Sequence, residues 1–167
     1  VSTKSVVVEK VVNKTLPIQI STTGALVAKE RSVLYSEVQG VFTSSSRPFK
    51  PGTGFKAGEA LIRINSSEYA ASVAAQRSSF KSLVTSSLAD IQFDYPGELE
   101  KWKRYSNSIN VNSSLPELPI TTSEQLKYFI TNRNIYSTYF NIKNLETRLR
   151  KYTISAPFNG VLVAANL

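Results

Sequence analysis

The chain has 167 residues, of which 41% are hydrophobic and 19% charged, and its formal net charge is +8. This composition is typical of a folded protein, and no apolar run reaches the roughly 20 residues that a membrane-spanning helix needs. Cysteine and histidine are both absent, which excludes disulfides, thiol nucleophiles, Ser-His-Asp catalysis and the commonest ligands of transition metals. We therefore predict no catalytic residue, no cofactor and no metal site.

The basic residues are spread along the chain. Residues 1–65 contain nine Lys and Arg against four acidic residues, and residues 66–151 contain eleven against eight. A nucleic-acid-binding tail would concentrate its basic residues in a denser block. We therefore predict no nucleic-acid partner and interpret the excess as a generally basic surface. The alternative is that it meets an acidic partner or anionic lipid headgroups.

The first 64 residues carry the signals of β-strands. Residues 5–12 are rich in β-branched side chains, residues 16–21 alternate apolar and polar side chains, and residues 25–28 resume after a glycine. Each pattern predicts a strand. A looser alternation continues over residues 31–42, and the apolar residues Leu61, Ile62 and Ile64 close the region. The glycines expected at structural turns are Gly40, Gly52, Gly58 and Gly160.

From residue 66 the apolar period changes to that of a helix. The helix should end near Tyr95, because Pro96 disfavours helical backbone at the preceding residue. A short second helix is expected from Glu98 to about Asn107, followed by a loop over residues 110–120. The stripe that predicts the first helix recurs at steps of four and three residues, at Tyr69, Val73, Gln76, Phe80, Leu83 and Ser87.

A third helix is predicted to begin after Thr121 or Thr122 and to run for about thirty residues, or roughly 45 Å. If Thr121 is the N-cap, Glu124 completes a capping box three residues later. Pro157 prevents the helix from continuing beyond the extended residues around Ile154. The two long helices would then run antiparallel, so residues 66–152 are predicted to form a helical hairpin of two or three helices.

Two runs far apart in the chain resemble the two halves of a biotinyl/lipoyl domain. Gly52-x-x-Phe55-x-x-Gly58-x-x-Leu61 is similar to the Gly-x-x-Val-x-x-Gly-x-x-Leu signature of those domains. Ala156-Pro157-Phe158-Asn159-Gly160-Val161 is similar to the run that opens their second half. Carrier domains hold a modified lysine on the tight turn between the halves. Here residues 65–152 replace that turn, so the resemblance implies a module with no lysine to acylate.

A lipoyl-like module opened by a helical hairpin resembles the periplasmic adaptor subunits of tripartite efflux pumps, also called membrane-fusion proteins. Ile64-Asn65-Ser66-Ser67-Glu68-Tyr69 is similar to the Ile-Asp-x-x-Glu-Tyr run with which the family's hairpin begins, and the run from Leu149 to Gly160 is similar to its end. The resemblance implies an α+β fold. Its parts would be strands of an incomplete β-barrel and membrane-proximal region at 1–30, a split lipoyl-like β-sandwich at 31–65 and 153–167, and an inserted antiparallel helical hairpin at 66–152.

The resemblance also implies a function. It predicts a non-catalytic adaptor in the periplasm of a Gram-negative cell, attached to the inner membrane as part of a longer protein. Its partners would be an inner-membrane transporter, expected to be of the resistance-nodulation-division type, an outer-membrane channel protein, and further copies of itself in a ring of three or six. An adaptor of an ABC-type exporter or type I secretion system is one alternative. A biotinyl or lipoyl carrier domain is another.

In this family the channel docks at the hairpin tip, where the usual pattern is Arg-x-x-x-Leu-x-x-x-x-x-x-Ser. The chain departs from that pattern, because Arg104 is followed four residues on by Ser108 and the next serine that could serve lies much farther along. Pro96 and the proline-containing loop at residues 110–120 further indicate a shorter or folded hairpin. The candidate partner-binding residues carried over from the resemblance are Lys103, Arg104, Ile109 and Ser123.

Overall fold

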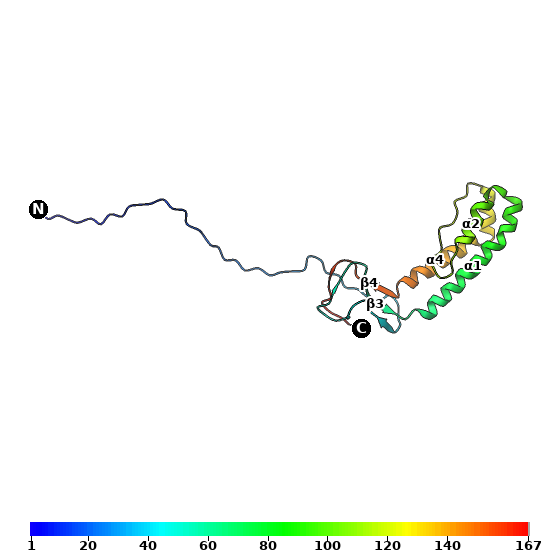
Figure 1. Cartoon of the computed structure of the whole chain (residues 1–167), viewed down its shortest axis with the longest axis horizontal. Helices are drawn as coiled ribbons and strands as arrows, with labels where there is room; N and C mark the ends of the chain where they lie inside the picture. The colour runs from blue at the N-terminus through cyan, green and yellow to red at the C-terminus, as the bar shows by residue number, and fades with distance from the viewer. Residues whose placement is uncertain (167) are drawn as a thin grey trace. The chain divides into compact units, whose positions relative to one another are not determined.

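The structure, a computed structural model, describes residues 1–166. The chain divides into two units, residues 1–33 and the part that begins at Leu34. The second unit combines helices with two small open sheets, so the predicted α+β class is confirmed (Figure 1). Leu167, the last residue of the predicted split module, lies outside the described residues.

Residues 1–33 contain no helix or strand, and all of their side chains are exposed. The strands predicted at residues 5–12, 16–21 and 25–28 are therefore wrong, and the described part of the chain contains no β-barrel. A strand requires a ladder of hydrogen bonds to a neighbour, whereas β-branched composition supplies only a preference for extended backbone. No described segment provides such a ladder for these residues.

Two antiparallel sheets bring the two distant runs of the sequence together. In the first sheet β3 (Ala60–Ile64) lies between β1 (Phe42–Ser44) and β4 (Thr153–Ser155). In the second, β2 (Gly54–Phe55) pairs with β5 (Gly160–Val161). The prediction that these runs pair is therefore confirmed.

The small core of the sheets fits this pairing. Phe55 and Leu61 come from the first run and Ala156 from the second, and all three side chains are buried. Residues on both sides of the helical insertion thus share one apolar cluster, which stabilises the pairing of the strands. The partly buried side chains around this cluster are Phe49, Ile62 and Leu162.

Two of the four predicted turn glycines have the backbone of a turn. Gly52 and Gly58 have φ angles of 87° and 82°, which any residue with a Cβ adopts only with strain. Gly160 lies in β5 and Gly40 has no positive φ, so the prediction of turns at these two positions is wrong. Gly40 is instead favoured by close packing, because a Cβ there would lie 2.6 Å from Cγ2 of Ile64.

Helix α1 (Ser67–Asp94) ends before Pro96, as predicted. A single 3-10 turn, η1 (Pro96–Glu98), leads into the short α2 (Leu99–Ser108). The buried stripe of α1 keeps the predicted steps of four and three residues but differs in register, because Gln76 is exposed and Arg77 is buried. The buried residues of the stripe are Val73, Arg77, Phe80, Val84, Ser87 and Ile91.

The predicted third helix is broken into two. Helix α3 (Glu124–Asn132) ends before Asn134, which has a left-handed backbone with φ 57°, and α4 (Ile135–Arg150) begins after it. Asparagine tolerates this conformation better than other residues with a Cβ. The N-cap of α3 is Ser123, whose hydroxyl accepts a hydrogen bond from the Leu126 N–H at 3.3 Å. The proposed N-cap at Thr121 is therefore wrong.

The helices form an antiparallel hairpin (Figure 1). Tyr69 near the start of α1 stacks on Tyr152 just after α4, while Asp90 near the end of α1 pairs with Arg133 between α3 and α4. Helix α2 packs beside α1. The buried core comes from all four helices, and its largest fully buried side chains include Phe80, Trp102, Leu126, Ile130, Ile135 and Ile142.

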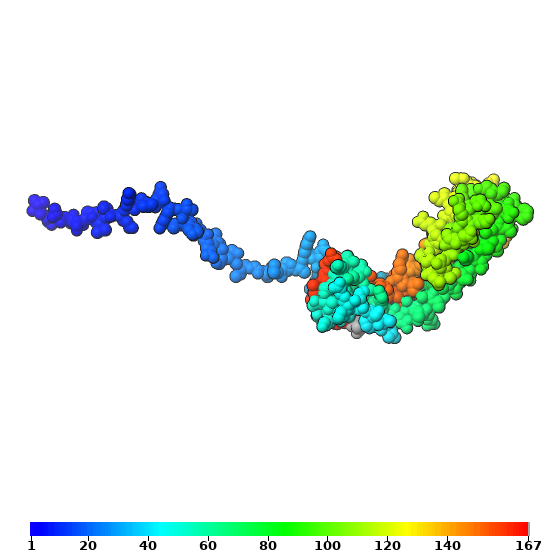
Figure 2. Space-filling model, viewed as in Figure 1, coloured from blue at the N-terminus to red at the C-terminus, as the bar shows by residue number. Residues whose placement is uncertain are grey.

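Residues 109–123, which we call the strap, connect α2 to α3 without a helix or strand. This confirms the loop predicted over residues 110–120. Ile109 and Leu115 anchor the strap in the core, where each is 2% exposed. In the space-filling view, the strap and its neighbours cover the first turns of α4. The last turns of α4, in orange, remain visible nearer the sheets (Figure 2). The strap thus adds a layer to the hairpin that begins at the level of Arg77 and Glu146.

Candidate interaction site on the helical hairpin

The distal end of the hairpin is formed by the end of α1, by η1 and by the first turns of α2 and α3. Tyr95 joins these elements. Its ring packs against Phe129 at a centroid distance of 5.9 Å, and its hydroxyl donates a hydrogen bond to the carbonyl of Gln125 at 3.4 Å. The distal end is therefore a packed surface built from three helices.

The structure places three of the four predicted partner-binding residues at or near this end. Lys103 and Arg104 are exposed on α2, and Arg104 Nε donates a hydrogen bond to the carbonyl of Glu100 at 3.3 Å. Ser123 caps α3. Ile109 lies just beyond the other end of α2 with its side chain buried in the core. Because its side chain is buried, Ile109 is not accessible to a partner. Its carbonyl accepts a hydrogen bond from Lys81 in the middle of α1, so the end of α2 lies away from the distal end.

Exposed apolar side chains mark this half of the hairpin. The sequence favours a core position for Phe93 over an exposed partner patch, and it places more aromatic residues after residue 121, Tyr128 among them, than one helix seam can bury. Phe93 at the end of α1 is 84% exposed, Ile120 in the strap is 87% exposed, and Tyr128 on α3 is 68% exposed. Aromatic residues are enriched at protein interfaces. The preferred core position of Phe93 is therefore wrong, and Ile120, which lies in a loop, had no signal in the sequence.

Charges of both signs surround these side chains. Three ion pairs at or near the surface, Asp90–Arg133, Glu98–Lys101 and Glu124–Lys127, each neutralise one positive and one negative charge. Such pairs contribute only about 0–1 kcal/mol each to stability. A surface with apolar side chains and mixed charge suits another protein better than a nucleic acid, which requires a basic face.

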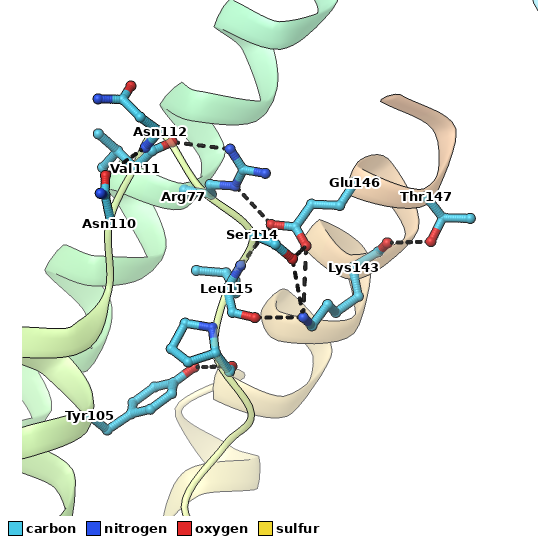
Figure 3. Close-up of polar contacts among 11 residues, drawn as sticks. Arg77, Tyr105, Asn110, Val111, Asn112, Ser114, Leu115, Lys143, Glu146 and Thr147 are labelled. Carbon is cyan, nitrogen blue, oxygen red and sulfur yellow. Dashed lines mark hydrogen bonds and ion pairs between the residues drawn. The ribbon is translucent and has the colours of Figure 1, made fainter. Parts of the chain in front are cut away.

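A buried ion pair lies deeper in the hairpin, between α1 and α4 (Figure 3). Arg77 Nε is 2.8 Å from Glu146 Oε1, and the two side chains are 8% and 7% exposed. Glu146 also accepts hydrogen bonds from the Ser114 hydroxyl and, at 2.9 Å, from the Leu115 N–H. The carboxylate therefore bonds to α1 and to the strap at once.

Three basic side chains hold the carbonyl groups of the strap (Figure 3). Arg77 Nη1 donates to the carbonyl of Val111 at 3.1 Å, and Lys81 Nζ donates to the carbonyl of Ile109 at 3.0 Å. Lys143 of α4 donates to the carbonyl of Leu115. Hydrogen bonds from charged donors are stronger than those between neutral groups. The network thus fixes the strap to α1 at its beginning and to α4 a few residues later.

Tyr105 supports the next part of the strap. Its hydroxyl donates a hydrogen bond to the carbonyl of Pro116 at 3.4 Å. Burial raises the pKa of Tyr105, and the nearby Tyr139 and Glu146 raise it further. Since a raised pKa keeps the phenol protonated, this hydrogen-bond donor persists over the whole range of ordinary pH.

The buried carboxylate makes stability depend on pH. Burial raises the pKa of Glu146, but hydrogen bonds from Ser114, Leu115 and Arg77 outweigh burial and hold that pKa below its ordinary value. A folded-state pKa below the unfolded one stabilises the fold above the unfolded pKa, and this stabilisation is lost as the pH falls through the folded pKa. We therefore expect the free energy of unfolding, measured by urea denaturation, to decrease below about pH 4.

Glu146→Gln should flatten this acid dependence, because the amide does not titrate. The matched control is Glu124→Gln, which removes a carboxylate from an exposed ion pair. It should leave the dependence on pH close to that of the native chain. If the free energy of unfolding changed equally with pH in the Glu146→Gln variant and in the native chain between pH 3 and pH 5, the buried carboxylate would not govern acid stability.

No family model matches the chain, and no curated protein or solved structure is significantly similar to it. Within the described residues, no three His, Cys, Asp or Glu side chains lie where they could hold a metal ion. None of the described helices has the length and apolar character needed to cross a membrane. Function is therefore inferred from the fold and from the contacts described above.

Proposed function

We propose that this chain is part of a periplasmic adaptor that links an inner-membrane transporter to an outer-membrane channel. The observation that carries the proposal is the pairing of β3 with β4, in which Ile62 lies opposite Ile154 although the whole hairpin separates them in sequence. One β-module thus contains a helical insertion. This is the arrangement implied by the resemblance of the two glycine-containing runs to a split lipoyl-like module.

The junction between sheet and hairpin suits a projecting element. The Ile64 N–H donates a hydrogen bond to the carbonyl of Tyr152 at 2.9 Å, so the chain leaves β3 and returns to β4 at adjacent points. The rings of Tyr69 and Tyr152 stack immediately beyond this bond. In the proposed role, the sheets pack against further copies in a ring, and the hairpin extends toward the channel.

The distal end of the hairpin provides the proposed surface for the channel. Phe93, Ile120 and Tyr128 supply exposed apolar contacts, and Lys103 and Arg104 supply exposed positive charge on α2. Aromatic and Arg side chains contribute most of the free energy of binding at typical interfaces. We propose that these residues, together with Ser123, contact the outer-membrane partner.

Deleting the hairpin tests the adaptor proposal. In the full-length protein, residues 65–152 are replaced by Asn-Gly, a sequence that favours the tight turn of a two-stranded hairpin. We expect export to fall to the level of a strain that lacks the protein, because no segment would then reach the channel. The measurement is the intracellular accumulation of a fluorescent efflux substrate, with the amount of the protein checked by immunoblotting.

A second variant keeps the fold and changes only the distal surface. Phe93→Ser, Ile120→Ser and Tyr128→Ser are combined, and since all three side chains are exposed the hairpin should remain folded. Export should decrease several-fold, because the apolar contacts with the channel are lost. Normal export by both the deletion and the triple variant, at normal protein levels, would overturn the proposed function.

A further inference from the structure

A cavity of about 350 Å³ lies where the strap meets the lower part of the hairpin. Its walls come from the first turns of α1, from the strap, from the end of α4 and from the start of β4. Ser66 and Ala70 contribute one side, Leu149 and Arg150 the other, and Ser114 lies on the side of the strap. The volume is sufficient for a small organic molecule.

Arg77 lines this cavity and has an unused hydrogen-bond donor. Its Nε binds Glu146 and its Nη1 binds the carbonyl of Val111, while Nη2 has no partner among the described residues (Figure 3). A guanidinium group has five N–H bonds arranged to hold a carboxylate through two of them. Because the Arg77 side chain is 8% exposed, a ligand would meet this donor largely shielded from water, where electrostatic attraction is stronger.

The charge around the cavity is positive. Glu146 is the one carboxylate in the wall, and its oxygens already accept hydrogen bonds from Arg77, Ser114 and Leu115. Arg150 adds a second guanidinium, whose Nη2 bonds only to the hydroxyl of Thr147 at 3.0 Å. The excess of positive charge favours an anion.

The remaining wall is apolar or carries hydroxyl groups. Leu149 and Ala70 offer hydrocarbon surface, and Ser66 offers a hydroxyl group that can donate to an anion. The single O–H of Ser114 is already donated to Glu146. We propose that this cavity binds a small organic anion in which a carboxylate is attached to an apolar group. The carboxylate would lie between Arg77 and Arg150, and the apolar group would contact Leu149. Such a ligand would connect the strap to the base of the hairpin.

Benzoate is the probe for this site, and neutral benzamide of nearly the same shape is the control ligand. Each is titrated into the ¹⁵N-labelled full chain at constant ionic strength, and binding is followed by the shifts of backbone amide resonances. Benzoate should shift the amides of Ala70, Ser114 and Leu149 in a saturable manner. Benzamide should shift them little, because it lacks the charge that the two guanidinium groups would bind.

Three variants locate the site. Arg150→Gln should weaken benzoate binding about tenfold, because it removes one charge-assisted hydrogen bond to the carboxylate. Since Arg150 is exposed, the substitution should leave the fold intact. Arg148→Gln makes the same change in net charge on the same helix but lies outside the cavity wall, so it should alter the affinity less than about twofold. Ala70→Leu retains a good helix former and fills the cavity, so it should abolish binding.

The outcomes separate a built site from general attraction to a basic protein. Saturable shifts at the cavity, lost in Arg150→Gln and Ala70→Leu and retained in Arg148→Gln, would support the proposal. Equal weakening by Arg148→Gln and Arg150→Gln, shifts confined to other regions, or no benzoate-dependent shift would overturn it. None of these readouts depends on export, so the result is independent of the adaptor proposal.

Discussion

Replacing Glu146 with alanine is expected to lower the free energy of unfolding by about 3–5 kcal/mol, because Arg77 would remain buried without a counter-charge. The same substitution also removes the acceptor that holds the Ser114 hydroxyl and the Leu115 N–H. Urea denaturation measures the loss, and the fluorescence of Trp102, the only tryptophan and 1% exposed, reports the unfolding.

Two further variants show whether the loss comes from the buried charge. Glu124→Ala removes one partner of an exposed ion pair and should cost no more than about 1 kcal/mol. Replacing both buried partners, as Arg77→Met with Glu146→Leu, should recover much of the stability, since apolar residues of similar volume often substitute for a buried pair. A cost below about 1 kcal/mol for Glu146→Ala would mean that the network does not hold the strap.

Phe80→Ala is expected to destabilise the chain by about 3–5 kcal/mol, the usual cost of truncating a fully buried aromatic side chain. Phe80 is fully buried in α1, and its ring lies 6.5 Å from that of Tyr105 and 6.1 Å from that of Tyr139. The substitution would leave a cavity between α1, α2 and α4. Urea denaturation of the full chain measures the effect.

Phe93→Ala is the matched control, because it makes the same chemical change on the same helix at a side chain that is 84% exposed. Its effect on stability should stay within about 0.5 kcal/mol. If the two variants lose similar stability, Phe80 is not part of the hairpin core. The pair therefore tests the register in which α1 packs against its neighbours.

Local sequence signals predicted much of the second unit. The resemblance of the run around Phe55 and of the run that begins at Ala156 to the halves of a lipoyl-like module implied that two distant segments pair, and the structure pairs them as β2–β5 and β3–β4. The proline at position 96 correctly ended the first helix. The proline signal succeeds because the proline ring restricts the backbone directly, whatever the tertiary contacts are.

The predictions that failed depended on tertiary contacts. Gln76 was placed in the stripe because it falls at the spacing of four and three residues. The adjacent Arg77 is buried instead, through its pairing with Glu146, 69 positions away. The helix break at Asn134 had a weak signal, since asparagine only permits a left-handed backbone. The strands expected before residue 30 were inferred from propensity alone, and propensity does not reveal whether a pairing partner exists.

The candidate site was predicted only in part for the same reason. Lys103 and Arg104 are exposed, as lysine and arginine side chains usually are in folded proteins. Ile109 was selected as the nearest aliphatic residue to a family pattern, but the strap turns its side chain into the core. The network that holds the strap uses its backbone groups, and backbone contacts of a loop leave almost no trace in a sequence.

The central claim is that the strands on either side of the hairpin form one β-module. Nuclear Overhauser contacts in the isotope-labelled full chain test it most directly. The account predicts cross-strand contacts between Arg63 and Thr153 and between Gly54 and Val161, the opposed residues of the two sheets. If residues 153–161 gave contacts only to their own sequence neighbours, the two runs would not pair, and the proposed adaptor would lose its structural basis.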